Sequence, residues 1–98
     1  MAPSDELRLE DIRAELDVVD RDLVAVLALR AALIEQVVRY KRQHRMGVVD
    51  RAREDAMLDH IETVAQAHEL DPRVARIVLR SVIDAFTLLE VEVLEPGE

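Results

Sequence analysis

The first half of the chain contains a run of about forty residues, 5–45, with neither glycine nor proline. Apolar residues recur along it at intervals of three and four, which predicts one continuous α-helix. At about 1.5 Å per residue this helix is about 60 Å long, more than a domain of 98 residues is wide. Such a helix cannot bury its apolar side within its own chain. We therefore expect an intertwined homodimer in which a second copy covers it.

Two shorter helices are expected after the long one. Residues 44–49 interrupt the apolar period and are expected to form a loop. Asp50 is a typical N-cap for a helix over about 51–68. Proline is favoured in the first turn of a helix, so Pro72 begins a third helix over about 72–94. The sequence thus predicts an all-α chain of three helices that forms a single domain over 1–98.

The composition excludes several classes of partner. The formal net charge of −8 disfavours binding to nucleic acid or to an anionic membrane surface, but a locally basic site can still bind a small anion. The chain has no cysteine, which rules out disulfides and thiol chemistry. We identify no signal peptide and no apolar stretch long enough to span a bilayer, so a cytoplasmic protein is expected.

Charged residues interrupt one apolar stripe of the long helix. The stripe consists of Arg13, Leu16, Asp20, Leu23, Leu27, Arg30, Ile34, Val37 and Lys41. A buried cation costs several kcal/mol unless an anion pairs with it, so Arg30, among leucines and isoleucine, predicts an anionic partner. Lys41 follows about 16 Å along the axis, close enough for two long side chains to bind one small anion. The alternative is that these side chains extend to solvent at the stripe edge.

Arg13 lies about 26 Å from Arg30 along the helix, too far to bind the same small ligand within one chain. In an antiparallel dimer, Arg13 of one chain can instead reach the site of its partner. This arrangement predicts two equivalent sites, each completed by the other chain. Exposure to solvent at the end of the helix is an equally open interpretation for Arg13.

The second and third helices add further candidates. Arg53 and Glu54 fall in the first turn of the second helix, where acids are favoured by the helix dipole whether or not a site is present. Glu90 interrupts an apolar stripe of the third helix that includes Ile83 and Phe86. It either lies at an exposed edge or points into the same pocket as the basic residues.

The ordered set of these motifs resembles the all-helical (type II) chorismate mutases over nearly the whole chain. The matching stretches are Ile12-Arg13, Leu16-Asp17, Val19-Asp20, Leu27-Ala28-Leu29-Arg30, Val38-Arg39-Tyr40-Lys41 and Asp50-Arg51-Ala52-Arg53-Glu54. The resemblance implies an intertwined dimer of three-helix chains. It also implies the Claisen rearrangement of chorismate to prephenate, an isomerase step of the shikimate pathway in aromatic amino acid biosynthesis, with no metal and no cofactor.

By this resemblance the basic residues bind a small dianionic substrate. Arg13, donated across the dimer interface, would hold one carboxylate and Arg30 the other. Lys41 would contact a carboxylate and the ether oxygen. The chemistry agrees with the residue types, because guanidinium groups bind carboxylates in bidentate fashion. A concerted rearrangement requires orientation of the substrate and positive charge near the ether oxygen, and neither a nucleophile nor a base.

The remaining site residues follow from the same resemblance. Asp50 and Arg53 would line the site, and Glu54 would accept a hydrogen bond from the substrate hydroxyl. Glu90 stands where many members have glutamine, so it would have to be protonated to donate to the ether oxygen. Phe86 stands where a small hydroxyl residue is common, so one contact to a substrate carboxylate is expected to be lost.

Three other functions remain open from the sequence. Two are sister reactions on the same fold: a 4-amino-4-deoxychorismate mutase, and an isochorismate pyruvate lyase. The lyases depart from the Arg-Glu pair that Arg53 and Glu54 preserve, which makes the lyase the least favoured. The third is a non-catalytic helical dimerisation or regulatory module. Activation of a small mutase by a partner enzyme is a further open expectation.

Overall fold

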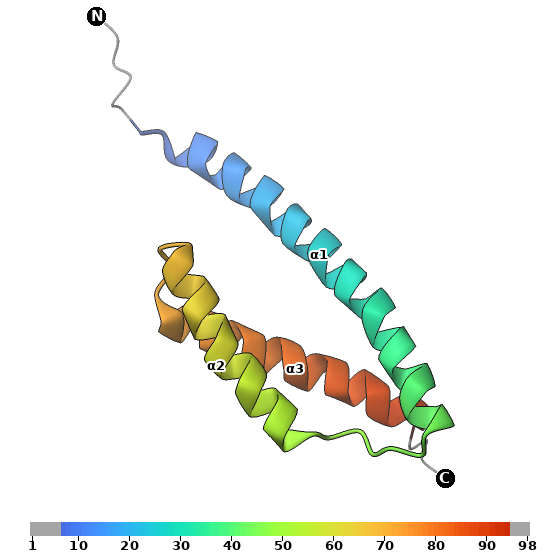
Figure 1. Cartoon of the computed structure of the whole chain (residues 1–98). Helices are drawn as coiled ribbons and strands as arrows, with labels where there is room; N and C mark the ends of the chain where they lie inside the picture. Colours follow the sequence, from blue (N-terminus) through green and yellow to red (C-terminus); the bar gives the residue numbers. More distant parts are fainter. Residues whose placement is uncertain (1–6, 95–98) are drawn as a thin grey trace, which may run out of the picture. The chain divides into compact units, whose positions relative to one another are not determined.

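The computed structural model describes residues 7–94, in which three helices and no strands are found. They are α1 (Leu9–Gln43), α2 (Arg51–Ala67) and α3 (Pro72–Leu94) (Figure 1). The all-α class and the three helices predicted from the sequence are confirmed. The chain divides into two compact units, residues 1–33 and 34–98, with the division inside α1.

The long first helix is shorter than predicted at its C-terminal end because the backbone reverses at Arg45. This residue adopts a left-handed conformation with φ of 52°. The N–H of Met46 donates to the carbonyl of Lys41 at 2.9 Å, and that of Arg45 donates to the carbonyl of Arg42 at 3.3 Å. These two bonds form a Schellman motif, which satisfies the last carbonyls of the helix. The expected start at residue 5 lies outside the described residues, and residues 7 and 8 precede α1.

The same motif ends α2. Glu69 has φ of 56°, and the N–H of Leu70 donates to the carbonyl of Ala65 at 2.9 Å. A second bond joins the N–H of Glu69 to the carbonyl of Gln66 at 3.1 Å. Because the turn at this end is short, α3 starts within a few residues of the end of α2, and the two helices run side by side (Figure 1).

Aspartates cap the starts of α2 and α3. Asp50 Oδ1 accepts a hydrogen bond from the backbone N–H of Arg53 at 3.1 Å, as its predicted role as N-cap requires. Asp71 Oδ1 accepts from the backbone N–H of Arg73 at 2.9 Å, and Pro72 is the first residue of α3. Each cap satisfies an N–H group that has no partner inside the helix.

The core of unit 34–98 lies between α2 and α3. Leu58 and Ala65 of α2 and Ala75 and Ile83 of α3 are buried there. Small residues on both helices allow close packing of their axes. Val38, near the end of α1, and Val48, in the following loop, are also buried. The loop and the last turns of α1 therefore belong structurally to this unit.

The part of α1 in unit 1–33 carries many exposed apolar side chains. Within α1 and up to residue 33, the large apolar residues that are at least 50% exposed are Leu9, Leu16, Val19, Leu23, Val24, Val26, Leu29 and Leu33. A row of this kind is typical of a helix that packs against another element. The intertwined homodimer and the single-domain organisation remain predictions. No helix among residues 7–94 is both long and apolar enough to cross a bilayer.

Candidate active site

Lys41 and Glu90 form a buried ion pair between the end of α1 and the end of α3. Lys41 Nζ lies 3.2 Å from Glu90 Oε1, and the two side chains are only 13% and 9% exposed. Lys41 Nζ also donates to the carbonyl of Val48 at 2.7 Å. Among the described residues, these two contacts use two of the three N–H donors of the ammonium, so one N–H remains for a ligand. The pair thus fixes a cation at a defined point in an apolar setting.

The local sequence explains why both charges are buried. Lys41 follows the buried Val38 by one helical turn, so the two side chains point to the same side of α1. Glu90 follows the buried Ile83 by two turns on α3 and shares its face. Burial of either charge alone would cost several kcal/mol, and mutual pairing offsets this cost. Of the two interpretations left open for Glu90, the exposed edge is therefore wrong.

Glu54 is held by a residue that the sequence analysis did not select, Arg80 of α3. Arg80 Nη1 donates to Glu54 Oε1 at 3.0 Å and to Asp84 Oδ1 at 3.3 Å. The neighbouring Glu54 carboxylate is the main cause of a pKa of Arg80 that lies above its ordinary value, with Asp84 contributing. The only local signal was the spacing of Arg80 and Asp84 by four residues, which is common on solvated helix faces.

Asp50 and Arg53 are brought together by the start of α2. The contact uses the backbone N–H of Arg53, and both side chains are exposed in the described chain. Asp50 thus has a structural role as a cap, whatever it contributes to a ligand site. Their predicted roles toward a substrate remain predictions.

The other predicted site residues lie on helix faces of intermediate or high exposure. Phe86 is half-buried on the same side of α3 as Ile83 and Glu90. In unit 1–33, Arg30 is half-buried on α1, and Arg13 is exposed. The half-buried state of Arg30 agrees with its place in the apolar stripe, whereas Arg13 has the exposure expected for either of its two interpretations.

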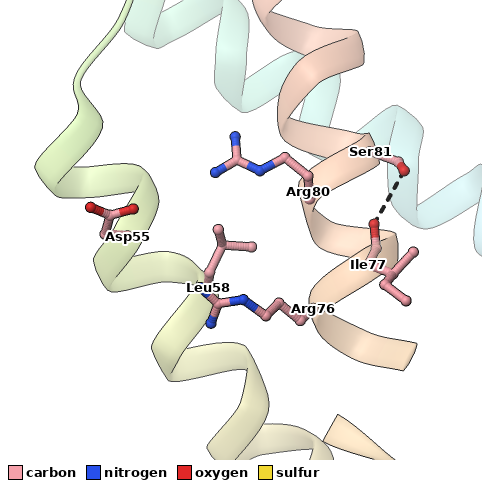
Figure 2. A pocket seen from close by; sticks show the side chains of 6 residues that line it. All are labelled: Asp55, Leu58, Arg76, Ile77, Arg80 and Ser81. Carbon is pink, nitrogen blue, oxygen red and sulfur yellow. Dashed lines mark hydrogen bonds between the residues drawn. The ribbon is translucent and has the colours of Figure 1, made fainter. Parts of the chain in front are cut away.

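A pocket of about 410 Å³ opens between α2 and α3. Its lining residues are Asp55, Leu58, Arg76, Ile77, Arg80 and Ser81 (Figure 2). None of the site residues predicted from the sequence lines it. Arg76 pairs with Asp59 and Glu62 of α2, at 3.3 and 3.5 Å. Because acidic side chains already pair with both arginines, this pocket does not offer free positive charge to an anion.

The described residues offer no cluster for a metal. Between residues 7 and 94, no group of three or more histidine or acidic side chains is arranged to hold a metal ion. The ion pairs that join helices in this range are instead one lysine–glutamate pair and two arginines with acidic partners.

Comparison with known proteins gives two matches. The family model described as "Chorismate mutase type II" matches residues 12–91, a range that contains every predicted site residue. The T-protein of Haemophilus influenzae is 35% identical over 72 residues. This match covers 74% of the present chain and 19% of that relative. The chain thus spans far less than the full length of the curated relative that it matches.

Proposed function

Because the chain belongs to the type II chorismate mutase family, we propose that it catalyses the rearrangement of chorismate to prephenate. The observation that supports this most directly is the Lys41 ammonium, held on an apolar surface by Glu90 and the Val48 carbonyl. A cation fixed in this way is available to a bound dianion without reorganising during the reaction. The proposed product places the enzyme in aromatic amino acid biosynthesis.

The reaction needs little from the protein beyond shape and charge. In the concerted rearrangement, the ether C–O bond breaks while a C–C bond forms, and no proton leaves the substrate. Negative charge grows on the ether oxygen as its bond to carbon lengthens. An N–H of Lys41 directed at that oxygen stabilises the transition state more than the ground state, which is the condition for catalysis. Binding the substrate in its compact conformer supplies the remainder.

In the free enzyme, Glu90 occupies one of the N–H donors of Lys41. In the structure its carboxylate accepts a hydrogen bond from Lys41 Nζ. A carboxylate cannot donate, so Glu90 contributes a hydrogen bond to the ether oxygen only in its protonated form. In the proposed complex, the N–H of Lys41 that is used by neither Glu90 nor the Val48 carbonyl donates to the substrate.

The other basic residues receive their roles from the family resemblance. Arg30 holds one substrate carboxylate, and Arg13 of the partner chain holds the other. This assignment requires a homodimer. The exposed leucines and valines along α1 support the dimer, because they give a second copy an apolar surface to cover. A cytoplasmic location and activation by a partner enzyme remain predictions.

Four residues complete the proposed site. Glu54 accepts the hydrogen bond of the substrate hydroxyl, and its side chain is only 14% exposed. Asp50 and Arg53 line the site at the start of α2, where Asp50 also fixes the backbone of Arg53. Phe86, half-buried one turn before Glu90, contributes apolar surface and no polar contact to a carboxylate.

A second candidate is the corresponding mutase of 4-amino-4-deoxychorismate. Acids near the substrate favour an amino group over a hydroxyl, and Glu54 and Glu90 are both present. Glu90 is already neutralised by Lys41 and Glu54 by Arg80, which favours the hydroxyl substrate. An assay with both substrates distinguishes these two functions.

The test is an assay of the purified protein with chorismate, 4-amino-4-deoxychorismate and isochorismate, with products separated by chromatography. We expect prephenate from chorismate at the highest kcat/KM of the three. Faster turnover of the amino compound would assign the second candidate, and release of pyruvate from isochorismate would assign the lyase. Absence of turnover with every substrate would reject a catalytic function and leave the dimerisation module.

A further inference from the structure

We infer that Arg80 is a positioning residue that orients Glu54 for its contact with the substrate hydroxyl. The inference rests on the proposed function, because that function gives Glu54 its partner. It starts from one geometric fact: Arg80 Nη1 on α3 donates to Glu54 Oε1 on α2 at 3.0 Å, across 26 positions of sequence. Arg80 lies outside the stretches that carry the family resemblance.

The two contacts of Arg80 differ in kind. Asp84 lies one turn away on the same helix and is 64% exposed, so its contact is a solvated helical pair that contributes little. Glu54 lies on the other helix and is only 14% exposed. A hydrogen bond to a poorly solvated carboxylate is stronger, because water competes less for the oxygen. Arg80 is thus directed mainly toward Glu54.

Orientation matters for Glu54 because its side chain has three rotatable bonds. When one oxygen of a carboxylate is fixed, the group can rotate only about an axis through that oxygen. The direction of its second oxygen is therefore restricted as well. With Oε1 bound by Arg80, Oε2 is the oxygen left to accept from the substrate hydroxyl. Without Arg80, the entropy of ordering Glu54 must be supplied when the substrate binds, and binding weakens.

The surroundings of Arg80 make it suitable for substitution. Its side chain lines the pocket between α2 and α3 and extends from α3 toward α2 (Figure 2). Shortening or neutralising it therefore leaves the buried residues of the interface in place. Arg76 lines the same pocket one turn earlier and also pairs with acids of α2, Asp59 and Glu62. Arg76 is thus a matched control whose acidic partners have no proposed role in the site.

The test compares steady-state kinetics with chorismate for wild type, Arg80→Met, Arg80→Lys and Arg76→Met, each with its fold checked by circular dichroism. We expect Arg80→Met to lower kcat/KM about tenfold, mainly through KM, because the contact to the hydroxyl is present before and during the reaction. Arg80→Lys should recover most of the loss, since an ammonium can still donate to Glu54. Arg76→Met should change kcat/KM by less than about twofold.

A double-mutant cycle separates positioning from packing. In a Glu54→Gln background, Arg80→Met should lower kcat/KM by less than about twofold further, because the group that it orients is already altered. Equal losses in Arg80→Met and Arg76→Met, or fully additive losses in the cycle, would overturn the inference and leave the proposed function standing. A wild-type protein that does not convert chorismate would overturn the proposed function, and the inference with it.

Discussion

Lys41 Nζ and Glu90 Oε1 lie 3.2 Å apart, although the two residues are 49 positions apart in the sequence. This pair connects the end of α1 to the end of α3. The hydrogen bond from Lys41 to the Val48 carbonyl also attaches the loop between α1 and α2 to this pair. Removing either member leaves a charge of low exposure without its partner. The same pair thus contributes to the stability of unit 34–98 and supplies the cation of the proposed site.

Replacing Lys41 should cost both stability and activity. Lys41→Met leaves the Glu90 carboxylate buried and unpaired, and breaking a buried ion pair on one side typically destabilises a protein by about 3 kcal/mol. We expect a lower midpoint of urea unfolding, followed by circular dichroism, and loss of measurable prephenate formation. Unchanged stability would show that the pair does not form in solution.

The double variant Lys41→Met with Glu90→Leu separates these two effects. An apolar pair of similar volume can replace a buried ion pair at little cost, so most of the lost stability should return. Activity should not return, because the cation is still missing. A double variant that regains turnover would contradict the role of Lys41 in the site.

Asp50 is expected to act as a cap and as a site residue, and two substitutions distinguish the roles. Asp50→Ala removes the acceptor for the Arg53 N–H and should lower the free energy of unfolding by about 1 kcal/mol. Asp50→Ser retains a capping oxygen and should keep the stability of wild type in a urea titration. If Asp50 also lines the site, Asp50→Ser still raises the KM for chorismate. Wild-type kinetics in the serine variant would restrict Asp50 to capping.

The start of α3 should give the chain a pH-dependent contribution to stability. The side chain and then the backbone N–H of Arg73 hold the pKa of Asp71 below its usual value of 3.8. A carboxyl whose pKa is lower in the folded state stabilises the fold above the unfolded pKa and loses this effect as pH falls through the folded pKa. Wild type should therefore be more stable than Asp71→Asn above pH 4, and the difference should shrink below pH 3.8. A difference in urea midpoint that stays constant from pH 6 to pH 2.5 would contradict this account.

Mixing two nearly inactive variants tests whether Arg13 acts across the dimer interface. Arg13→Ala and Arg30→Leu should each be nearly inactive alone, with about a hundredth of the wild-type kcat/KM or less. In a heterodimer, one of the two sites takes Arg30 from one chain and Arg13 from the other and is intact. Unfolding and refolding the two variants together in equal amounts should therefore restore about a quarter of wild-type activity. No recovery on mixing, or full activity of Arg13→Ala alone, would reject the donated arginine.

Much of the fold followed from local signals in the sequence. The absence of glycine and proline from the first segment indicated a long helix, and the aspartates before α2 and α3 marked where those helices start. The end of α1 was harder to predict, because the chain turns at Arg45 in a left-handed conformation. The glycine that would ordinarily mark such a turn, Gly47, stands two residues later. Left-handed residues other than glycine are uncommon, so their positions are poorly marked in sequence.

The site was predictable as a set of residues but not as a set of contacts. A charge on an apolar stripe, such as Lys41 or Glu90, indicates a required partner but does not name it. Arg80 shows the limit most clearly, because its main partner Glu54 lies on another helix. Pairing between helices depends on their relative rotation and register, which periodicity within one helix does not determine.

Turnover of chorismate by wild type and by Arg30→Leu tests the central claim most directly. The claim is that basic side chains on apolar helix faces are there to bind a small dianion and catalyse its rearrangement. Wild type should form prephenate, and Arg30→Leu should remain folded with kcat/KM lower by about a hundredfold or more. A leucine variant that is more stable and equally active, or a wild type that forms no prephenate, would contradict the account.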